Sequence, residues 1–136
     1  MYNIFDIFRF DGTSVVRSKS SIYNHYVTSL GNYQNRAVAI GDNWYGHRKV
    51  EMFENDIWSE LSDFPFVNEY ISGYSVATLN EKLYIFGGYG DNQVIDIAAM
   101  FDGGWTQIGH LMFPRAGHRT ITMSNNIIHI GGYGEQ

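Results

Sequence analysis

Apolar residues in this chain occur in short runs that end at glycine or at polar turn residues. The clearest run, 82–87, is continuously apolar after its lysine, as a strand covered on both faces by other sheets would be. Its flanks predict one strand over 74–79 and another over 94–101. The Asp-Gly-Gly stretch at 102–104 predicts a hairpin, because glycine readily takes positive φ, and 105–108 then forms a short fourth strand. No helical spacing is sustained, so the predicted fold class is all-β, built from four-stranded antiparallel units.

The four predicted strands, a to d in chain order, belong to a repeating pattern. Residues 83–90 recur as 127–134, a shift of 44 positions, and both copies contain Gly-Gly-Tyr-Gly. A weaker copy is 37–42, where Asp42 replaces the second glycine. The frame of this copy stays open, because its Gly-Asp-Asn also resembles 90–92. Repeats of this length indicate propellers or helical arrays, and the strand pattern favours a propeller.

The repeat divides the chain into four segments. Residues 1–22 resemble strands c and d of a preceding blade, and 23–64 form a degenerate first repeat. Residues 65–112 form the second repeat, and 113–136 the first half of a third. The sum is about three blades, whereas closed propellers usually have at least about four. A lone blade buries too little surface to offset its lost conformational entropy, so we expect a fragment, a truncated product, or a partner in an assembly that supplies further blades.

Two copies of one motif carry a resemblance to a known family. In each copy an apolar strand ends in two glycines and an aromatic residue follows, and in the first copy a tryptophan comes later. This pattern resembles the kelch repeat, which implies a kelch-type β-propeller fragment. No Trp-Asp dipeptide closes a repeat, as it would in a WD40 propeller. The motif residues expected to shape the blades are Gly87, Gly88, Tyr89, Trp105, Gly131, Gly132, Tyr133 and Trp58.

Composition and charge narrow the possible partners. The formal charge is −5 and the nine Lys and Arg residues are scattered, so the basic stripe that nucleic-acid binding requires is missing. No apolar run reaches the roughly 20 residues of a membrane span. Cysteine is absent and the first residues lack the features of a signal peptide, which suits a cytoplasmic protein. We therefore expect neither a nucleic acid nor a membrane as partner.

No residue pattern predicts a catalytic or metal centre. The histidines lack zinc-site spacing, so we expect no metal and no cofactor, with His118 structural and His129 buried and hydrogen-bonded in its strand. The acidic stretch that begins at Glu51 is expected to be solvated charge on outer strands. The kelch resemblance extends to copper oxidases of the galactose oxidase type, whose cofactor needs a Tyr–Cys cross-link. Without cysteine that activity is excluded, and we expect no enzyme.

The kelch resemblance also implies where a partner would bind. In such propellers the b–c and d–a loops emerge on one face, which commonly receives a protein or peptide. The corresponding loops here are rich in Trp, Tyr and Arg, the residues enriched at interaction hot spots. The candidate contact residues are Asn43, Trp44, Tyr45, His47, Arg48, Phe66, Asn68, Tyr70, Tyr89, Asp91, Asn92, His110 and Arg115.

These observations favour a protein-interaction module that acts as a scaffold or as a substrate-recognition surface. The resemblance implies actin or a ubiquitin-ligase substrate among possible partners, although no BTB-like segment accompanies these repeats. Two alternatives stay open. One is a propeller enzyme or carbohydrate-binding domain, and the other is a truncated chain without a function of its own.

Overall fold

The computed structural model describes residues 7–26, 28–42 and 44–134. These residues form β-strands and no α-helix, so the all-β prediction is confirmed. Within these ranges there is accordingly no helix that could cross a membrane. The strands are β1 (Ile7–Phe10), β2 (Val15–Ser18), β3 (Leu30–Tyr33), β4 (Arg36–Asp42), β5 (His47–Glu54), β6 (Ile57–Leu61), β7 (Ile71–Ser72), β8 (Ser75–Leu79), β9 (Lys82–Phe86), β10 (Tyr89–Gly90), β11 (Gln93–Val94), β12 (Ile97–Phe101), β13 (Trp105–His110), β14 (Arg119–Met123) and β15 (Asn126–Ile130).

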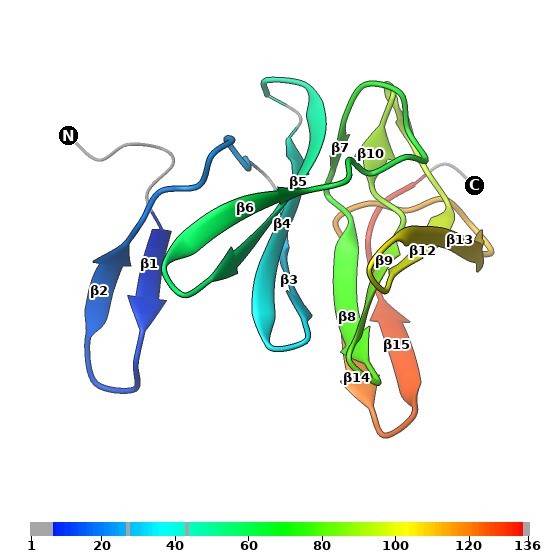
Figure 1. The fold of residues 1–136 in the computed structure, drawn as a ribbon. Helices are drawn as coiled ribbons and strands as arrows, with labels where there is room; N and C mark the ends of the chain where they lie inside the picture. The colour runs from blue at the N-terminus through cyan, green and yellow to red at the C-terminus, as the bar shows by residue number, and fades with distance from the viewer. Residues whose placement is uncertain (1–6, 27, 43, 135–136) are drawn as a thin grey trace.

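Two four-stranded antiparallel sheets form the centre of the structure. Their strand orders are β3-β4-β5-β6 and β8-β9-β12-β13, and the two-stranded hairpins β1–β2 and β14–β15 flank them. In both central sheets the turn from strand a to strand b contains two residues with positive φ, which are Gln34-Asn35 and Asn80-Glu81. Figure 1 shows the four sheets in a row, with these turns and those of the flanking hairpins at the lower edge.

The predicted strand 94–101 is wrong in its length, because the chain forms two strands there. Gln93–Val94 (β11) and Ile97–Phe101 (β12) are separate. β10 pairs with β11 and with β7, and the three make a small sheet at the upper edge of the molecule. A backbone hydrogen bond from Ile95 N to Gly88 O at 2.9 Å joins the two ends of the segment that carries β10 and β11. The predicted b–c loop is thus partly an ordered sheet.

Strand β9 is covered on both faces, as its continuous apolar run predicts. Leu83 and Ile85 lie in the core between the two four-stranded sheets, together with Val38 and Ile40 of β4. Phe86 lies in a second cluster, on the side of β14–β15. Full burial of one such side chain contributes about 1.5–3 kcal/mol. Stacking of neighbouring sheets therefore supplies burial that a single sheet could not provide.

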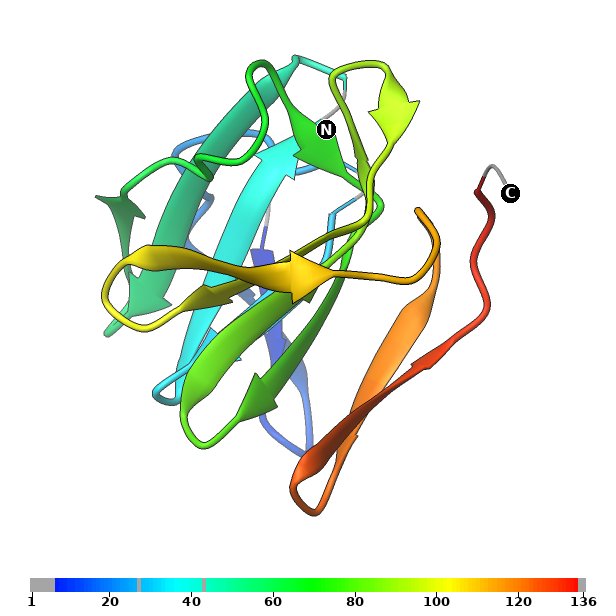
Figure 2. The ribbon, with the colours of Figure 1, turned by 90° about the vertical axis from the view of Figure 1, so that its right-hand side faces the viewer.

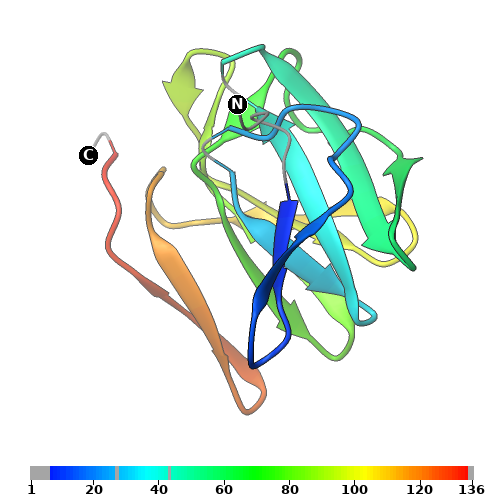
Figure 3. The same ribbon diagram turned by 90° about the vertical axis from the view of Figure 1, so that its left-hand side faces the viewer.

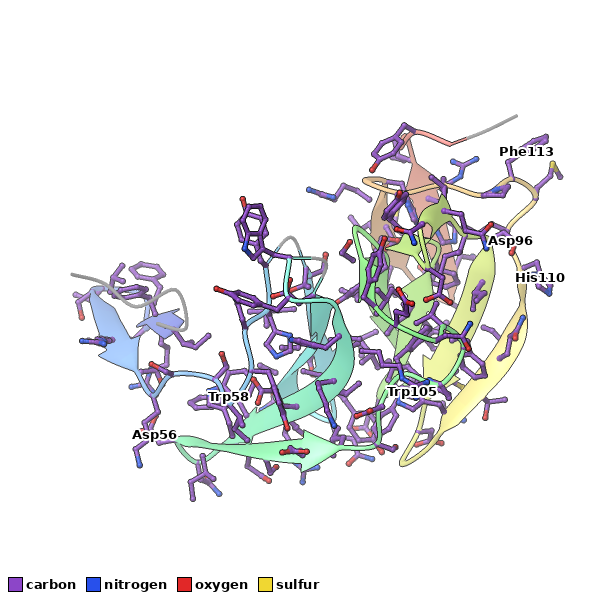
Figure 4. The ribbon with its side chains drawn as sticks, turned by 90° about the horizontal axis from the view of Figure 1, so that it is seen from above. Asp56, Trp58, Asp96, Trp105, His110 and Phe113 are labelled. Atoms are coloured by element: carbon purple, nitrogen blue, oxygen red, sulfur yellow. The ribbon has the colours of Figure 1, made fainter. Side chains whose placement is uncertain are left out.

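The tryptophans of strand d connect each sheet to the chain segment before it. The indole N–H of Trp58 donates to the carbonyl of Lys19 at 3.1 Å, and that of Trp105 donates to the carbonyl of Ser62 at 3.0 Å. The two bonds occupy equivalent places in successive repeats. Figure 4 labels both tryptophans in a view from above. An indole N–H paired in this way is satisfied while its ring packs against neighbouring aromatics.

Threonines of strand a make a second set of connections, between neighbouring sheets. Thr78 Oγ1 donates to the carbonyl of Asn32 at 2.6 Å. Thr122 Oγ1 donates to the carbonyl of Thr78 at 2.8 Å, and Thr120 Oγ1 to that of Val76 at 2.7 Å. Strands β3, β8 and β14 therefore follow one another in space as they do in the repeat, which is the radial order of propeller blades.

The glycines that end strand b hold the backbone where a side chain would collide. Gly87 has a φ of +59°, and a Cβ there would meet the carbonyl of Arg115. In the degenerate repeat Gly41 has a φ of +67°, and a Cβ there would meet the carbonyl of Ile71. Gly41 therefore occupies the backbone position of Gly87. Positive φ also occurs at Gly88, Gly131 and Gly132.

Replacing Trp58 by phenylalanine is expected to lower the free energy of unfolding by about 1 kcal/mol, because the hydrogen bond to Lys19 is lost while an aromatic ring remains. Trp58→Ala is expected to cost about 3–5 kcal/mol, since the indole is almost fully buried. Urea denaturation followed by circular dichroism measures both losses. Trp44→Phe, at an exposed tryptophan, is the matched control and should change little. Equal losses in the two phenylalanine variants would contradict the packing described for Trp58.

Candidate functional site: the upper loop surface

A buried carboxylate holds two loops together at the upper edge of the first four-stranded sheet. Asp42 ends β4 and is fully buried. Its Oδ1 accepts the backbone N–H of Trp44 at 2.6 Å and that of Tyr45 at 3.3 Å, and its Oδ2 accepts the N–H of Tyr26 at 3.2 Å. Hydrogen bonds to a charged acceptor are stronger than neutral ones. The loop before β3 and the turn after β4 are therefore fixed to each other.

The two loops present three aromatic side chains to solvent, Tyr26, Trp44 and Tyr45, which we call the aromatic cluster. Their exposed fractions are 55%, 74% and 60%. The rings of Tyr26 and Trp44 meet nearly edge to face, with centroids 6.0 Å apart. Together with Asn24 the cluster lines a hollow of about 280 Å³. Exposed aromatic rings on a backbone held in place have the composition and rigidity of interaction hot spots.

A hydrogen-bonded pair of His25 and Glu51 lies close to the segment that carries Tyr26. His25 Nε2 is 2.9 Å from Glu51 Oε1, and His25 Nδ1 is 2.9 Å from the carbonyl of Gly41. Glu51 is fully buried and also accepts the backbone N–H of Ile22 at 3.0 Å. The expectation that Glu51 is solvated charge is therefore wrong. The carboxylate instead fastens the segment before β3 to β5.

His47 supports the same segment as a neutral ring. Its Nε2 lies 2.7 Å from the carbonyl of Asn24 and therefore donates, while its Nδ1 accepts the backbone N–H of Lys49 at 3.2 Å. Burial lowers the pKa of His47, which favours this uncharged form. Since both ring nitrogens are engaged within the chain, His47 serves to position Asn24 at the edge of the hollow.

Asp91 has in the second repeat the role that Asp42 has in the first. Its Oδ2 accepts the backbone N–H of Asn68 at 2.7 Å, and its Oδ1 accepts that of Glu69 at 2.8 Å. Burial favours the neutral acid, but these donors outweigh it and lower the pKa of Asp91. The Gly-Asp-Asn resemblance between the two repeats thus has a physical basis, because both aspartates tie a b–c loop to the loop before strand a.

A second hollow lies between the β10–β11 turn and the end of β13. It has a volume of about 430 Å³, and Phe66, Asp91 and His110 are among the residues that line it. His110 Nδ1 is 3.0 Å from Asp96 Oδ1, and its Nε2 is 3.2 Å from Gln107 Nε2, so the amide donates to the ring. Asp96 and His110 are labelled in Figure 4. The described lining residues include no serine, threonine or cysteine, so no hydroxyl or thiol nucleophile lines this hollow.

The histidines near the C-terminal hairpin are structural. His118 is fully buried with its Nε2 2.7 Å from Ser75 Oγ, and burial lowers its pKa to about 4. His129 packs against Phe86 with ring centroids 4.4 Å apart. It was predicted to be buried and hydrogen-bonded, which is wrong, since the residue is half-buried and its Nδ1 has no partner among the described residues. Over residues 7–26, 28–42 and 44–134, no three His, Asp or Glu side chains lie close enough together to hold a metal ion.

Most predicted contact residues are engaged within the chain. Arg48 Nη1 donates to the carbonyl of Val67 at 2.9 Å. The hydroxyl of Tyr70 accepts the backbone N–H of Asn92 at 3.1 Å, and Arg115 donates to a backbone carbonyl at 3.2 Å. Each of these side chains orders a loop that also carries other predicted residues. Through these hydrogen bonds the side chains stabilise the loops of the upper surface.

Trp44 and Tyr45 are the predicted contact residues that the structure brings together at the surface. Asn43, which lies between β4 and them, is outside the described residues. Tyr89 lies beside Tyr70, with ring centroids 6.1 Å apart. Sequence reasoning missed Tyr26, because nothing in its surroundings indicated that the carboxylate at the end of β4 would draw its backbone beside Trp44.

Comparison with known proteins shows which motif and which fold the chain resembles. The Kelch motif family matches residues 71–102, which include β8, β9 and β12. No curated protein sequence matches the chain. Among solved structures, YjhT resembles the chain with a TM-score of 0.64 and 22% identity over 78% of this chain and 34% of that one. At that identity the likeness concerns the fold, and the chain spans about a third of the YjhT chain. Residues 71–102 thus match the kelch motif, and the sheets are arranged as blades of a β-propeller.

Proposed function

We propose that this chain is a protein-recognition module and that the aromatic cluster forms the centre of its binding surface. The observation that carries the proposal is the arrangement around Asp42, where one buried carboxylate fixes the backbone of three exposed aromatic residues. Binding to such a surface orders little additional backbone, so less of the contact energy is lost to entropy. The partner that suits it is a protein with an apolar side chain to place in the hollow of about 280 Å³.

The charge of the chain supports a protein partner with some basic character. The formal charge is −5. Near the hollow, Asp42 is a buried carboxylate, Glu51 is paired with His25, and His47 is held neutral. A partner that brings an apolar anchor flanked by Lys or Arg would match both the rings and this local field, because cations are attracted to aromatic faces.

The hollow beside His110 is a weaker candidate for the same role. Its polar groups are already paired with one another, since Asp96 and Gln107 hold both ring nitrogens of His110. A ligand would have to break these bonds before making its own. We therefore assign it a peripheral place on the binding surface and place the hot spots on Trp44 and Tyr45.

Affinity capture with the tagged 136-residue chain supplies candidate partners, and purified partners then allow dissociation constants to be compared. The double variant Trp44→Ala/Tyr45→Ala is expected to weaken binding by about 100-fold or more, because a hot-spot aromatic contributes ~2 kcal/mol or more. Circular dichroism should show that the variant remains folded, since both side chains are largely exposed.

Ile57→Ala is the matched control, because this side chain is 61% exposed but lies beside the β5–β6 turn and not on a b–c or d–a loop. It should bind every partner as the wild type does. A partner bound equally by the wild type and by the double variant would contradict the proposal. Binding of oligosaccharides on a glycan array that depends on Trp44 and Tyr45 would instead make the cluster a carbohydrate site, with the same residues in a different function.

A further inference from the structure

The hollow of the aromatic cluster has walls made largely of rings. Tyr26, Trp44 and Tyr45 line it together with Asn24. The rings of Tyr26 and Trp44 are inclined by 67° to each other, so they stand as two steep walls. Its volume of about 280 Å³ lies below the roughly 300–1,000 Å³ of pockets that take drug-sized ligands. The hollow therefore suits one side chain or one small ligand group.

The aromatic cluster lies at the upper edge of the molecule, where a ligand can reach it. Figure 3 shows the segment 19–26, in blue, and the turn after β4 at this edge. In Figure 2 the same turn lies near the β10–β11 turn, at the end opposite to the a–b turns. Each of the three rings is more than half exposed. Occupation of the hollow therefore requires no opening of the core.

The electrostatic surroundings of the cluster favour a positively charged ligand. The carboxylate of Asp42 accepts hydrogen bonds from the backbone of all three ring-bearing residues, so it lies directly behind them. The faces of aromatic rings carry the negative part of the ring quadrupole. The neighbouring basic side chains are bound elsewhere, because Lys49 pairs with Asp63 at 3.4 Å and Arg48 donates to the carbonyl of Val67.

Rings around a hollow and a carboxylate behind them are the composition of a site for a methylated ammonium group. A cation over the face of Trp or Tyr is attracted to it, and the attraction grows when the cation is desolvated. The ammonium of unmodified lysine is compact and strongly hydrated, which opposes its entry into an aromatic hollow. Three methyl groups remove the N–H donors and surround the charge with apolar surface. Such a group loses little hydration and fills the space between the rings.

We propose that the side chain bound by the aromatic cluster is a trimethylated lysine of a partner protein. The inference rests on the proposed function and names the anchor that the partner brings. A trimethyllysine is both apolar and cationic, so it satisfies the rings and the carboxylate of Asp42 together. A choline lipid headgroup has the same ammonium chemistry. However, the formal charge of −5 opposes the approach of the chain to a membrane surface that carries anionic lipids.

The first test compares three capped amino acids as probes, titrated into the 136-residue chain and followed by NMR shifts of Trp44. The probes are the N-acetyl methylamides of trimethyllysine, of lysine, and of a neutral analogue in which carbon replaces the side-chain nitrogen of trimethyllysine. We expect trimethyllysine to bind about 10-fold or more tightly than either of the others, because only it combines charge with low hydration. Equal affinity for trimethyllysine and its carbon analogue, or no shift of Trp44 with trimethyllysine, would overturn the inference.

Trp44→Phe tests the contribution of the indole, since tryptophan attracts cations more strongly than phenylalanine does. The variant should bind the trimethyllysine probe severalfold more weakly, although an aromatic ring remains at the site. Ile57→Ala, at an exposed apolar side chain beside the β5–β6 turn, is the matched control and should bind it as the wild type does. Unchanged affinity of Trp44→Phe would contradict a cation held on the indole face.

Captured partners separate this inference from the proposed function. A protein whose binding depends on Trp44 and Tyr45 should carry a trimethylated lysine that mass spectrometry identifies, and replacing that lysine by glutamine should weaken binding about 10-fold or more. A partner that needs both residues but has no methylated lysine would refute the inference and leave the proposed function standing. Retention of the chain on phosphatidylcholine vesicles that is lost in Trp44→Ala would assign the hollow to a lipid headgroup and refute the protein anchor.

Discussion

Gly87→Ala is expected to lower the free energy of unfolding by about 2–5 kcal/mol, a large share of the roughly 5–15 kcal/mol that keeps a domain folded. Two costs add. A φ of +59° disfavours any residue with a Cβ by about 1–2 kcal/mol. The new methyl group would also collide with the carbonyl of Arg115 and approach the ring of His118 to 3.0 Å, and such overpacking costs about 1–3 kcal/mol. Urea denaturation followed by circular dichroism measures the loss.

Gly103→Ala separates the two costs. Gly103 has a φ of +75°, and the nearest atom to an added Cβ is the hydroxyl of Tyr33 at 4.0 Å. Only the backbone penalty of about 1–2 kcal/mol applies there. If Gly87→Ala proves no more destabilising than Gly103→Ala, the close approach of the next blade to Gly87 is not as described.

Acid is expected to destabilise the fold through His118, with the loss beginning below about pH 6.5. Burial lowers the pKa of the folded-state imidazole to about 4, whereas the unfolded chain binds its proton near pH 6.5. Because the folded-state pKa is the lower one, the stabilisation is complete above pH 6.5 and is lost as pH falls towards 4. The difference amounts to about 3 kcal/mol at the acid end of this window. Urea unfolding at pH 7 and at pH 4.5 measures most of it.

His118→Gln isolates this contribution, because glutamine keeps a polar partner for Ser75 but does not titrate. The variant should lose clearly less stability between pH 7 and pH 4.5 than the wild type does. His47 and His129 also have pKa values lowered by burial, so the variant keeps a smaller acid sensitivity. Identical pH dependence in the two proteins would show that His118 is accessible to protons in the folded state.

The repeat made the blades predictable. Glycine readily takes the positive φ found where strand b ends, so Gly87 and Gly88 mark the same backbone position that Gly131 and Gly132 mark 44 residues later. Both faces of a stacked sheet are buried, so β9 shows a continuous apolar run. The strand over 94–101 was drawn too long, because apolar character cannot distinguish a strand of the main sheet from β11, which pairs with β7 at the upper edge.

The binding surface was less accessible to sequence reasoning, because it depends on carboxylates whose partners are distant along the chain. In the sequence, Asp42 stands where the motif has its second glycine, which gives no sign that its oxygens accept hydrogen bonds from the backbone of Tyr26 and Trp44. Glu51 lies in a stretch of acidic residues and pairs with His25, which lies in the loop before β3, 26 positions earlier in the chain. Burial of these charges follows from strand register, which composition does not specify.

One nuclear Overhauser spectrum tests the stacking of the blades most directly. The structure places the ring of Tyr33 on that of Phe101, with centroids 4.9 Å apart, and the ring of Phe86 on that of His129 at 4.4 Å. Each pair joins two neighbouring sheets. We expect cross-peaks between the ring protons of both pairs. A folded protein whose assigned spectrum lacks them would contradict the propeller arrangement of these sheets.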